Sequence, residues 1–154
     1  MRKAARVVII QNQNILLIKR DKFGLKYYTL PGGEIEMGET ADQAATRELY
    51  EETNIKATPP KLIYVEDAGD MYGTQYIFTA DYQDGEAKMR DESIEAELNK
   101  NGQNLYHPVW VPVSKFAQLP FRSTVLQNEL LKGMRDGWPS EPQMLKSQAE
   151  ISNK

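Results

Sequence analysis

Residues 33–55 read GEIEMGETADQAATRELYEETNI, and this run predicts one helix from Thr40 to Thr53. Thr40 is a suitable N-terminal cap, and Gln43 stands three residues later, as a capping box requires. Asn54 can end the helix, because asparagine tolerates the left-handed backbone conformation. Both ends of the helix are therefore specified by local sequence.

One face of this helix combines small apolar residues with acids. At about 100° per residue, the members of that face fall within about 120° of one another; they are Ala41, Ala44, Ala45, Glu48, Glu51 and Glu52. The alanines predict a face packed close to a sheet. Glutamates at this spacing repel one another, and partial burial raises the cost unless a cation compensates or a carboxyl stays protonated. A solvated charged helix is the competing interpretation.

The spacing of the fixed residues in this run resembles the signature of the Nudix hydrolase family, including its MutT-like members. That signature is Gly, five residues, Glu, seven residues, Arg-Glu, an aliphatic residue, any residue, Glu-Glu, any residue, Gly and an aliphatic residue. The positions in register are Gly33, Glu39, Arg47, Glu48, Leu49, Glu51, Glu52 and Ile55. Asn54 stands where the family has glycine, a change that leaves the carboxylates intact and keeps a residue suited to a left-handed helix end.

The fold that the resemblance implies is of the α/β class, the Nudix fold, an α/β/α sandwich with a mixed central sheet. Apolar runs independently predict strands at Lys3–Ile10, Gln13–Arg20, Tyr27–Leu30, Lys61–Glu66, Thr74–Tyr82 and Tyr106–Val113. Ser114 is expected to cap a short turn, and Ser123–Arg135 is expected to form a second amphipathic helix. We expect a domain over residues 1–137 and a polar C-terminal tail over residues 138–154 that adds little to the core.

The resemblance also implies a metal site and a set of catalytic residues. Glu48, Glu51 and Glu52 would bind Mg²⁺, for which Mn²⁺ can substitute, with the Gly32 carbonyl as a fourth ligand. Arg47 lies one turn before Glu51 and can pair with it, which would fix that side chain for ligation.

The general base is left open among three glutamates. Glu51 or Glu52 could act through a metal-bound water, and Glu95, in an acidic loop, is the candidate from outside the signature. Glu39 is expected to orient Arg47 rather than to bind metal strongly. Solvent exposure of a loop residue is the alternative for Glu95.

The candidate substrate-binding residues are Arg20, Tyr28, Gly32 and Gly33. Arg20 ends a predicted strand, where it could meet a phosphate or remain a surface charge. Tyr27 and Tyr28 point to opposite faces of a strand, so that one should enter the core and the other can stack on a base.

Composition narrows the possible function. The chain has no cysteine and one histidine, His107, so that any metal must be held mainly by oxygen. The net charge of −3 gives no reason to expect nucleic-acid binding. The apolar runs are too short to span a membrane, and without an export signal we expect a cytoplasmic protein. A homodimer is left open.

The expected function is hydrolysis of a pyrophosphate bond in a nucleoside diphosphate linked to a group X, such as a nucleoside triphosphate, a nucleotide sugar or ADP-ribose. A catalytically silent Nudix-fold module that senses nucleotides is the main alternative, although such modules usually lose carboxylates that this sequence keeps. A calcium-binding protein is disfavoured, because the acids lie on a helix rather than in a calcium-hand loop.

Overall fold

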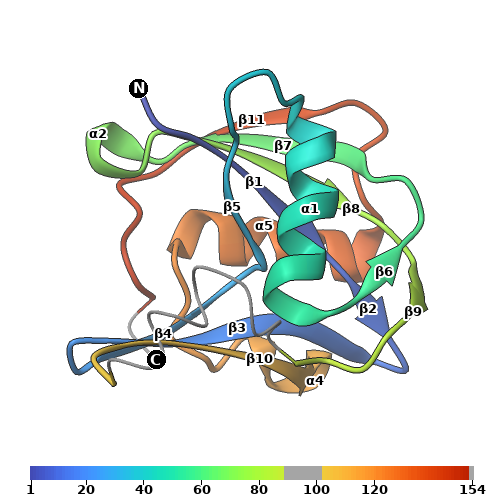
Figure 1. The fold of residues 1–154 in the computed structure, drawn as a ribbon, viewed down its shortest axis with the longest axis horizontal. Helices are drawn as coiled ribbons and strands as arrows, with labels where there is room; N and C mark the ends of the chain where they lie inside the picture. The colour runs from blue at the N-terminus through green and yellow to red at the C-terminus, as the bar shows by residue number, and fades with distance from the viewer. Residues whose placement is uncertain (89–101, 153–154) are drawn as a thin grey trace.

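A mixed five-stranded sheet forms the centre of the chain, for which a computed structural model describes residues 1–88 and 102–152 (Figure 1). Its strands, in spatial order, are β11 (Gln143–Lys146), β7 (Lys61–Asp67), β8 (Thr74–Thr79), β1 (Lys3–Val8) and β5 (Gly32–Glu34). β1 runs parallel to β8 and antiparallel to β5, which brings the Gly32–Gly33 pair beside the first strand.

A second sheet contains β10 (Asn104–Pro112), β3 (Asn14–Lys22) and β2 (Ile10–Gln11), with β4 (Leu25–Thr29) paired to β3. The antiparallel β3–β10 register sets Arg20 opposite Tyr106. β10 is an edge strand of this sheet, a position that tolerates the two prolines it contains. Two short strands, β6 (Lys56–Ala57) and β9 (Tyr82–Asp84), form a separate pair.

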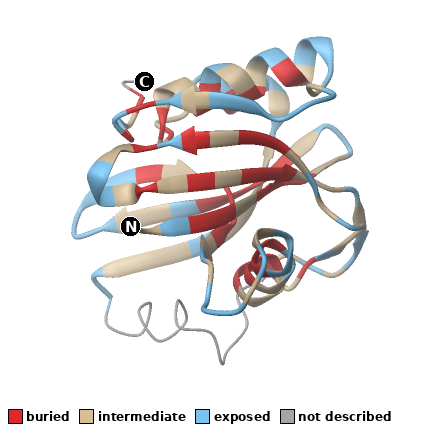
Figure 2. Cartoon of the chain, turned by 90° about the horizontal axis from the view of Figure 1, so that it is seen from above, coloured by how far each residue is buried: buried red, intermediate tan, exposed pale blue. Residues whose placement is uncertain are grey.

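Two long helices, α1 (Ala41–Thr53) and α5 (Thr124–Asp136), lie on opposite sides of the strands (Figures 1 and 2). Consecutive residues of β1 serve both sides: Val7 belongs to the apolar cluster that includes α1, and Val8 to the one that includes α5. This alternation follows from the two-residue repeat of a strand. The predicted α/β/α arrangement with a mixed sheet is confirmed.

The predicted ends of α1 are confirmed at both termini. Gln43 N donates to Thr40 Oγ1 at 3.3 Å, and Thr40 N donates to Gln43 Oε1 at 2.9 Å, which completes the capping box. Asn54 adopts the left-handed conformation, with φ 63° and ψ 17°, and its N–H donates to the Tyr50 carbonyl at 2.8 Å. The ends of α1 are therefore fixed without a glycine.

Two expectations about the C-terminal third are wrong. The described residues form two short helices, α2 (Gly69–Tyr72) and α4 (Val113–Phe116). α4 begins after Pro112 with no side-chain cap, so that Ser114 does not cap it. The segment after Trp138 contributes a strand, β11, which pairs with β7, and Ala149 is buried. Without β11, one edge of β7 would have unpaired backbone N–H and C=O groups, and β11 provides hydrogen-bond partners for them. The division at residue 137 stays a prediction.

The described helices include none whose length and apolar character would suffice to cross a lipid bilayer.

Candidate active site

The acidic face of α1 is turned toward the molecule rather than toward solvent. Glu48 and Glu52 are 7% and 2% exposed, although both are carboxylates, and Ala44 and Ala45 on the same face are fully buried. The Glu51 side chain, at 38% exposure, lies at the border of this face. Buried carboxylates need compensating positive charge or hydrogen-bond donors, and both are present.

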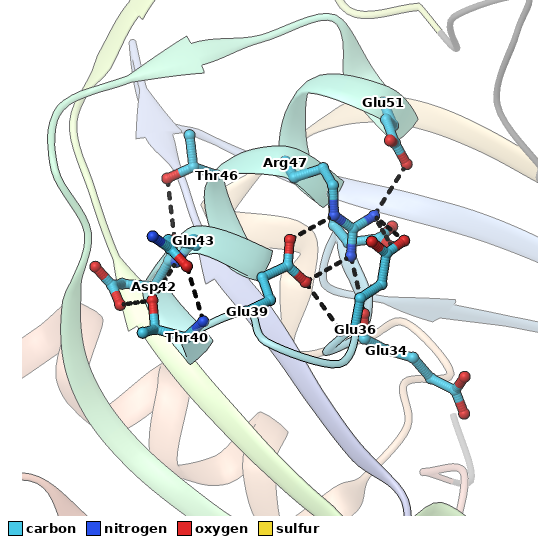
Figure 3. A network of polar contacts seen from close by, with 10 residues as sticks. Glu34, Glu36, Glu39, Thr40, Asp42, Gln43, Thr46, Arg47 and Glu51 are labelled. Atoms are coloured by element: carbon cyan, nitrogen blue, oxygen red, sulfur yellow. Dashed lines mark hydrogen bonds and ion pairs between the residues drawn. The ribbon is translucent and has the colours of Figure 1, made fainter.

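Arg47 is the centre of an ion-pair network on this helix (Figure 3). Its Nε and Nη2 donate to the two oxygens of Glu39, at 2.7 and 3.0 Å. Its Nη1 contacts both Glu48 Oε1, at 2.8 Å, and Glu51 Oε2, at 3.2 Å. The predicted Arg47–Glu51 pair and the contact of Glu39 with Arg47 are thus present. The hydrogen bonds that Arg47 donates to Glu39 raise the pKa of Arg47, so that its guanidinium stays charged.

The Glu39–Arg47 pair should make stability depend on acid pH. Hydrogen bonding from Arg47 holds the pKa of Glu39 below its ordinary value of 4.5. Its contribution is therefore complete above about pH 4.5 and is lost as the pH falls through the folded-state pKa. We expect the free energy of unfolding of wild type to exceed that of Glu39→Gln at pH 7, and this difference to shrink toward pH 3. Urea titrations without divalent ions measure it, and a pH-independent difference would contradict the assignment.

The glycine pair before the helix makes room for the carboxylates. Gly32 N–H donates to Glu52 Oε1 at 2.7 Å, which fixes that side chain against the loop. A Cβ on Gly33 would lie 2.6 Å from the Glu48 carboxyl carbon. On Gly32, whose φ is +151°, a Cβ would lie 2.1 Å from the backbone oxygen of Ala5. Gly33 therefore makes space for Glu48, whereas Gly32 permits the close approach of β5 to β1.

These residues fit a hard divalent cation in their chemistry. The donors are carboxylate and carbonyl oxygens, which magnesium prefers, and the glycine at position 33 leaves the Glu48 carboxylate its space. Within residues 1–88 and 102–152, no three acidic or histidine side chains converge closely enough to hold an ion. Arg47 Nη1 instead contacts both Glu48 Oε1 and Glu51 Oε2.

A cavity lies beside Arg6, whose side chain contacts the Gly32 peptide. Arg6 lines it and donates through Nη1 to the Gly32 carbonyl at 3.3 Å, an oxygen with a second lone pair still available. Burial lowers the pKa of Arg6, whereas the charge of Glu52 opposes that shift. The charged side chains that line the cavity, among the described residues, are five cations and one acid: Arg2, Arg6, Arg20, Lys22, Arg122 and Glu66. The cationic cavity is thus connected to the acidic face of α1 through Arg6 and the Gly32 peptide.

A family model described as the NUDIX domain matches residues 1–131. The chain belongs to the NUDIX family. This establishes the predicted family on most of the chain, well beyond the signature over residues 33–55.

Two curated relatives are each 36% identical to part of the chain. One is an ADP-ribose pyrophosphatase of Methanocaldococcus jannaschii, 36% identical over 96 residues, which cover 59% of this chain and 57% of that protein. The other is a putative 8-oxo-dGTP diphosphatase of Bacillus subtilis, 36% identical over 81 residues and covering 53% of each protein. The chain thus spans little more than half the length of these curated relatives.

Solved structures agree on the NUDIX fold. An ADP-ribose pyrophosphatase from Streptococcus suis superimposes with a TM-score of 0.65 at 16% identity, covering 93% of this chain and 98% of that one. The MutT protein from Bacillus halodurans gives a TM-score of 0.64 at 18% identity, covering 99% and 95%. At such identities the likeness concerns the fold alone.

Of the residues predicted to bind substrate in this NUDIX domain, Arg20 lines the cavity, and Gly32 and Gly33 border the carboxylates. Tyr28 packs against the apolar cluster of α5, whereas its neighbour Tyr27 lines the cavity. The two rings thus point to opposite faces of the strand, as expected, but Tyr27 rather than Tyr28 lines the cavity. Glu95, the predicted base from outside the signature, lies outside the described residues.

Sequence reasoning missed the other cationic residues of the cavity wall, above all Arg6 and Arg122. Arg6 had a detectable signal, because it is the only charged residue in an otherwise apolar strand from Ala4 to Ile10. A buried charge in such a position marks a site or a compensated pair. Arg122 had no comparable signal, since it lies in a loop before α5.

Proposed function

We propose that the chain hydrolyses a phosphoanhydride bond in a nucleoside diphosphate linked to a further group X. The observation that carries this proposal is the junction at Gly32, where a carboxylate cluster on one helix adjoins a cationic, tyrosine-lined cavity. Negative side chains suit a metal-dependent reaction centre. Positive and aromatic side chains suit the phosphate-bearing remainder of such a substrate.

Glu48, Glu51 and Glu52, with the Gly32 carbonyl, are the residues that would hold Mg²⁺, and Mn²⁺ would serve in its place. A bound divalent cation neutralises phosphate oxygens and lowers the pKa of bound water. The proposal is supported by the burial of Glu48 and Glu52 and by the shared contact of Glu48 and Glu51 with one Arg47 nitrogen.

Arg47 and Glu39 act as positioning residues in this proposal. Two hydrogen bonds hold the guanidinium plane on Glu39, which leaves Nη1 to orient Glu48 and Glu51. Such bidentate geometry restricts both side chains. The Gly32 N–H likewise fixes Glu52.

The proton of the attacking water requires an acceptor near these carboxylates. Glu51 and Glu52 are the candidates within the described residues, and Glu95, outside them, remains a candidate from the sequence. Glu51 is the more accessible of the first two, whereas Glu52 is nearly enclosed. A general base must lie within hydrogen-bond reach of the water that it deprotonates.

A panel of nucleotides tests the proposed reaction. The panel contains ADP-ribose and 8-oxo-dGTP, after which the two relatives are named, together with dGTP and a nucleotide sugar. We expect magnesium-dependent release of a nucleoside monophosphate from at least one compound, separated chromatographically from phosphate and pyrophosphate, and no release with chelator. Tight binding of a nucleotide without any turnover would instead favour the sensing module and refute the hydrolase.

A further inference from the structure

The cavity wall contains an alternating series of guanidinium groups and phenol rings. In spatial order the series runs Arg2, Tyr72, Arg122, Tyr27, Arg20 and Tyr106, all of which line the cavity. The guanidinium carbons lie 5.9, 4.5, 4.8, 5.6 and 3.7 Å from the successive ring centroids. We call these six residues the stacked wall. Each contact is of the cation–π type, which favours a guanidinium over the face of a ring.

The stacked wall is assembled from distant parts of the chain. Arg2 lies beside β1, Arg20 is on β3, Tyr27 is on β4 and Tyr106 is on β10. The isolated parallel bridge between Tyr28 and Phe121 brings the segment of Arg122 alongside β4. Several backbone elements therefore hold the planes of these side chains, and stacking leaves each guanidinium edge restricted in orientation.

Two of the three arginines of the stacked wall have no acidic partner in the described part of the chain, whereas Arg2 pairs with Glu34 at 3.3 Å. Among the described residues, Arg20 and Arg122 form no ion pair; their recorded acceptors are neutral, the Leu105 carbonyl and the Asn104 side chain for Arg20, and the Ala149 carbonyl for Arg122. Arg122 Nε is buried and finds no hydrogen-bond acceptor there. Like charges gathered in this way repel, so that an anion entering the cavity relieves the repulsion.

We propose that the stacked wall is a second anion subsite, which receives a phosphoryl group of the substrate remote from the bond that is cleaved. This inference rests on the proposed function. It narrows the substrate class to nucleoside diphosphate compounds that carry an additional phosphate monoester, either on the nucleoside or on group X.

A phosphoryl group fits this wall better than a neutral base. A base would stack on an open ring face, but Tyr27 and Tyr72 each already contact two arginines. Guanidinium N–H groups, in contrast, donate in the plane of the group, where they suit phosphate oxygens. The chain as a whole carries a net charge of −3, so that this concentration of cations is a local feature.

The stacked wall is also connected to the proposed reaction centre. Arg6 lines the same cavity and donates to the carbonyl of Gly32, whose N–H donates to Glu52. The Arg6 side chain and the Gly32 peptide therefore link the cavity to Glu52 on the acidic face of α1. A substrate whose diphosphate lies at the carboxylates can extend a second phosphate into the cavity.

Binding can be measured without catalysis by titrating ribose 5-phosphate, with ribose as the neutral control, in the absence of metal. The readout is the ¹H–¹⁵N resonances of the arginine Nε–H groups. We expect saturable shifts for Arg20 and Arg122 with the phosphate only, weakened about tenfold or more by Arg122→Gln or Arg20→Gln, as for loss of a charge-assisted hydrogen bond. Arg135→Gln is the matched control, because Arg135 is exposed and pairs only with Asp136 among the described residues. Equal shifts with ribose, or non-saturating shifts, would overturn the subsite.

Turnover of three related compounds then distinguishes the origin of the phosphate: ADP-ribose, its 2′-phosphate and its 1″-phosphate. We expect one phosphorylated compound to exceed ADP-ribose in kcat/KM by about tenfold or more. Arg122→Gln and Arg20→Gln should abolish that preference through KM, whereas Arg122→Lys should restore part of it because it keeps the charge but not the planar stack. Equal kcat/KM for all three compounds would reject the subsite while leaving the hydrolase proposal intact. Phosphate binding without turnover would reject the hydrolase alone.

Discussion

Replacement of Glu52 by glutamine is expected to lower kcat by about 10²–10⁴-fold, the range associated with loss of an acid–base or charge-stabilising group. Glu52 is 2% exposed and accepts the Gly32 N–H at 2.7 Å. Glutamine has the same shape, and its Oε1 can accept the same hydrogen bond. The substitution thus removes a negative charge and a ligand without removing the contact that positions the loop. Turnover of the best compound in the nucleotide panel, with magnesium, measures the effect.

The fold of Glu52→Gln should survive. We expect its melting temperature to stay within about 4 °C of wild type, equivalent to roughly 1 kcal/mol for a domain of this size. Glu141→Gln, on an exposed position far along the chain, is the matched control and should keep full turnover. Wild-type turnover in Glu52→Gln would reject the assignment of this residue.

Gly33→Ala should weaken the response of the activity to magnesium while leaving the stability of the fold nearly unchanged. The new Cβ would approach all three atoms of the Glu48 carboxyl group, at 2.6, 2.7 and 2.8 Å. These atoms lie at the end of a flexible side chain, which can rotate away at small conformational cost. We therefore expect near-normal stability, but a magnesium concentration for half-maximal activity that rises about 10–100-fold, as when the surroundings of a metal ligand are altered. Magnesium titration of the turnover rate provides the measurement.

Gly32→Ala is the contrasting variant. Its Cβ would meet backbone atoms of Ala5 and Arg6, at 2.1 and 2.8 Å, at a φ of +151°. Backbone atoms of a paired strand cannot rotate away, so that β5 must shift from β1, and we expect destabilisation of about 1–3 kcal/mol or more. Unfolding in urea compares the two variants. Equal loss of stability in both would show that Gly33 serves packing rather than the Glu48 carboxylate.

Local signals in the sequence were sufficient for the acidic helix. Thr40, Gln43 and Asn54 act within a few residues of themselves, and the capping box and the left-handed end are both present. The burial of Glu48 and Glu52 also followed from their place beside the alanines. A helical repeat relates side chains over short distances, and this information is contained in the order of residues.

The cavity could not be predicted in the same way, because it depends on pairing between distant segments. Arg20 meets Tyr106 only through the antiparallel register of β3 and β10. Tyr28 was the predicted substrate-binding ring, but the alternation of a strand does not say which of two neighbouring residues faces a cavity, and here the buried Tyr27 lines it. Strand β11 was not predicted because it forms by pairing with the edge of β7, and that edge exists only once the sheet has folded.

Arg47 gives the acidic helix a built-in counterion. Its guanidinium contacts four carboxylates, those of Glu36, Glu39, Glu48 and Glu51, at 3.6 Å or less. Repulsion among these acids is therefore partly offset once the chain is folded, in contrast to small metal-dependent domains that stay unfolded until the ion binds. If the proposed site takes up magnesium, Glu48 and Glu51 would exchange their contact with Arg47 Nη1 for the metal, and protein treated with chelator should stay folded and able to bind the ion again.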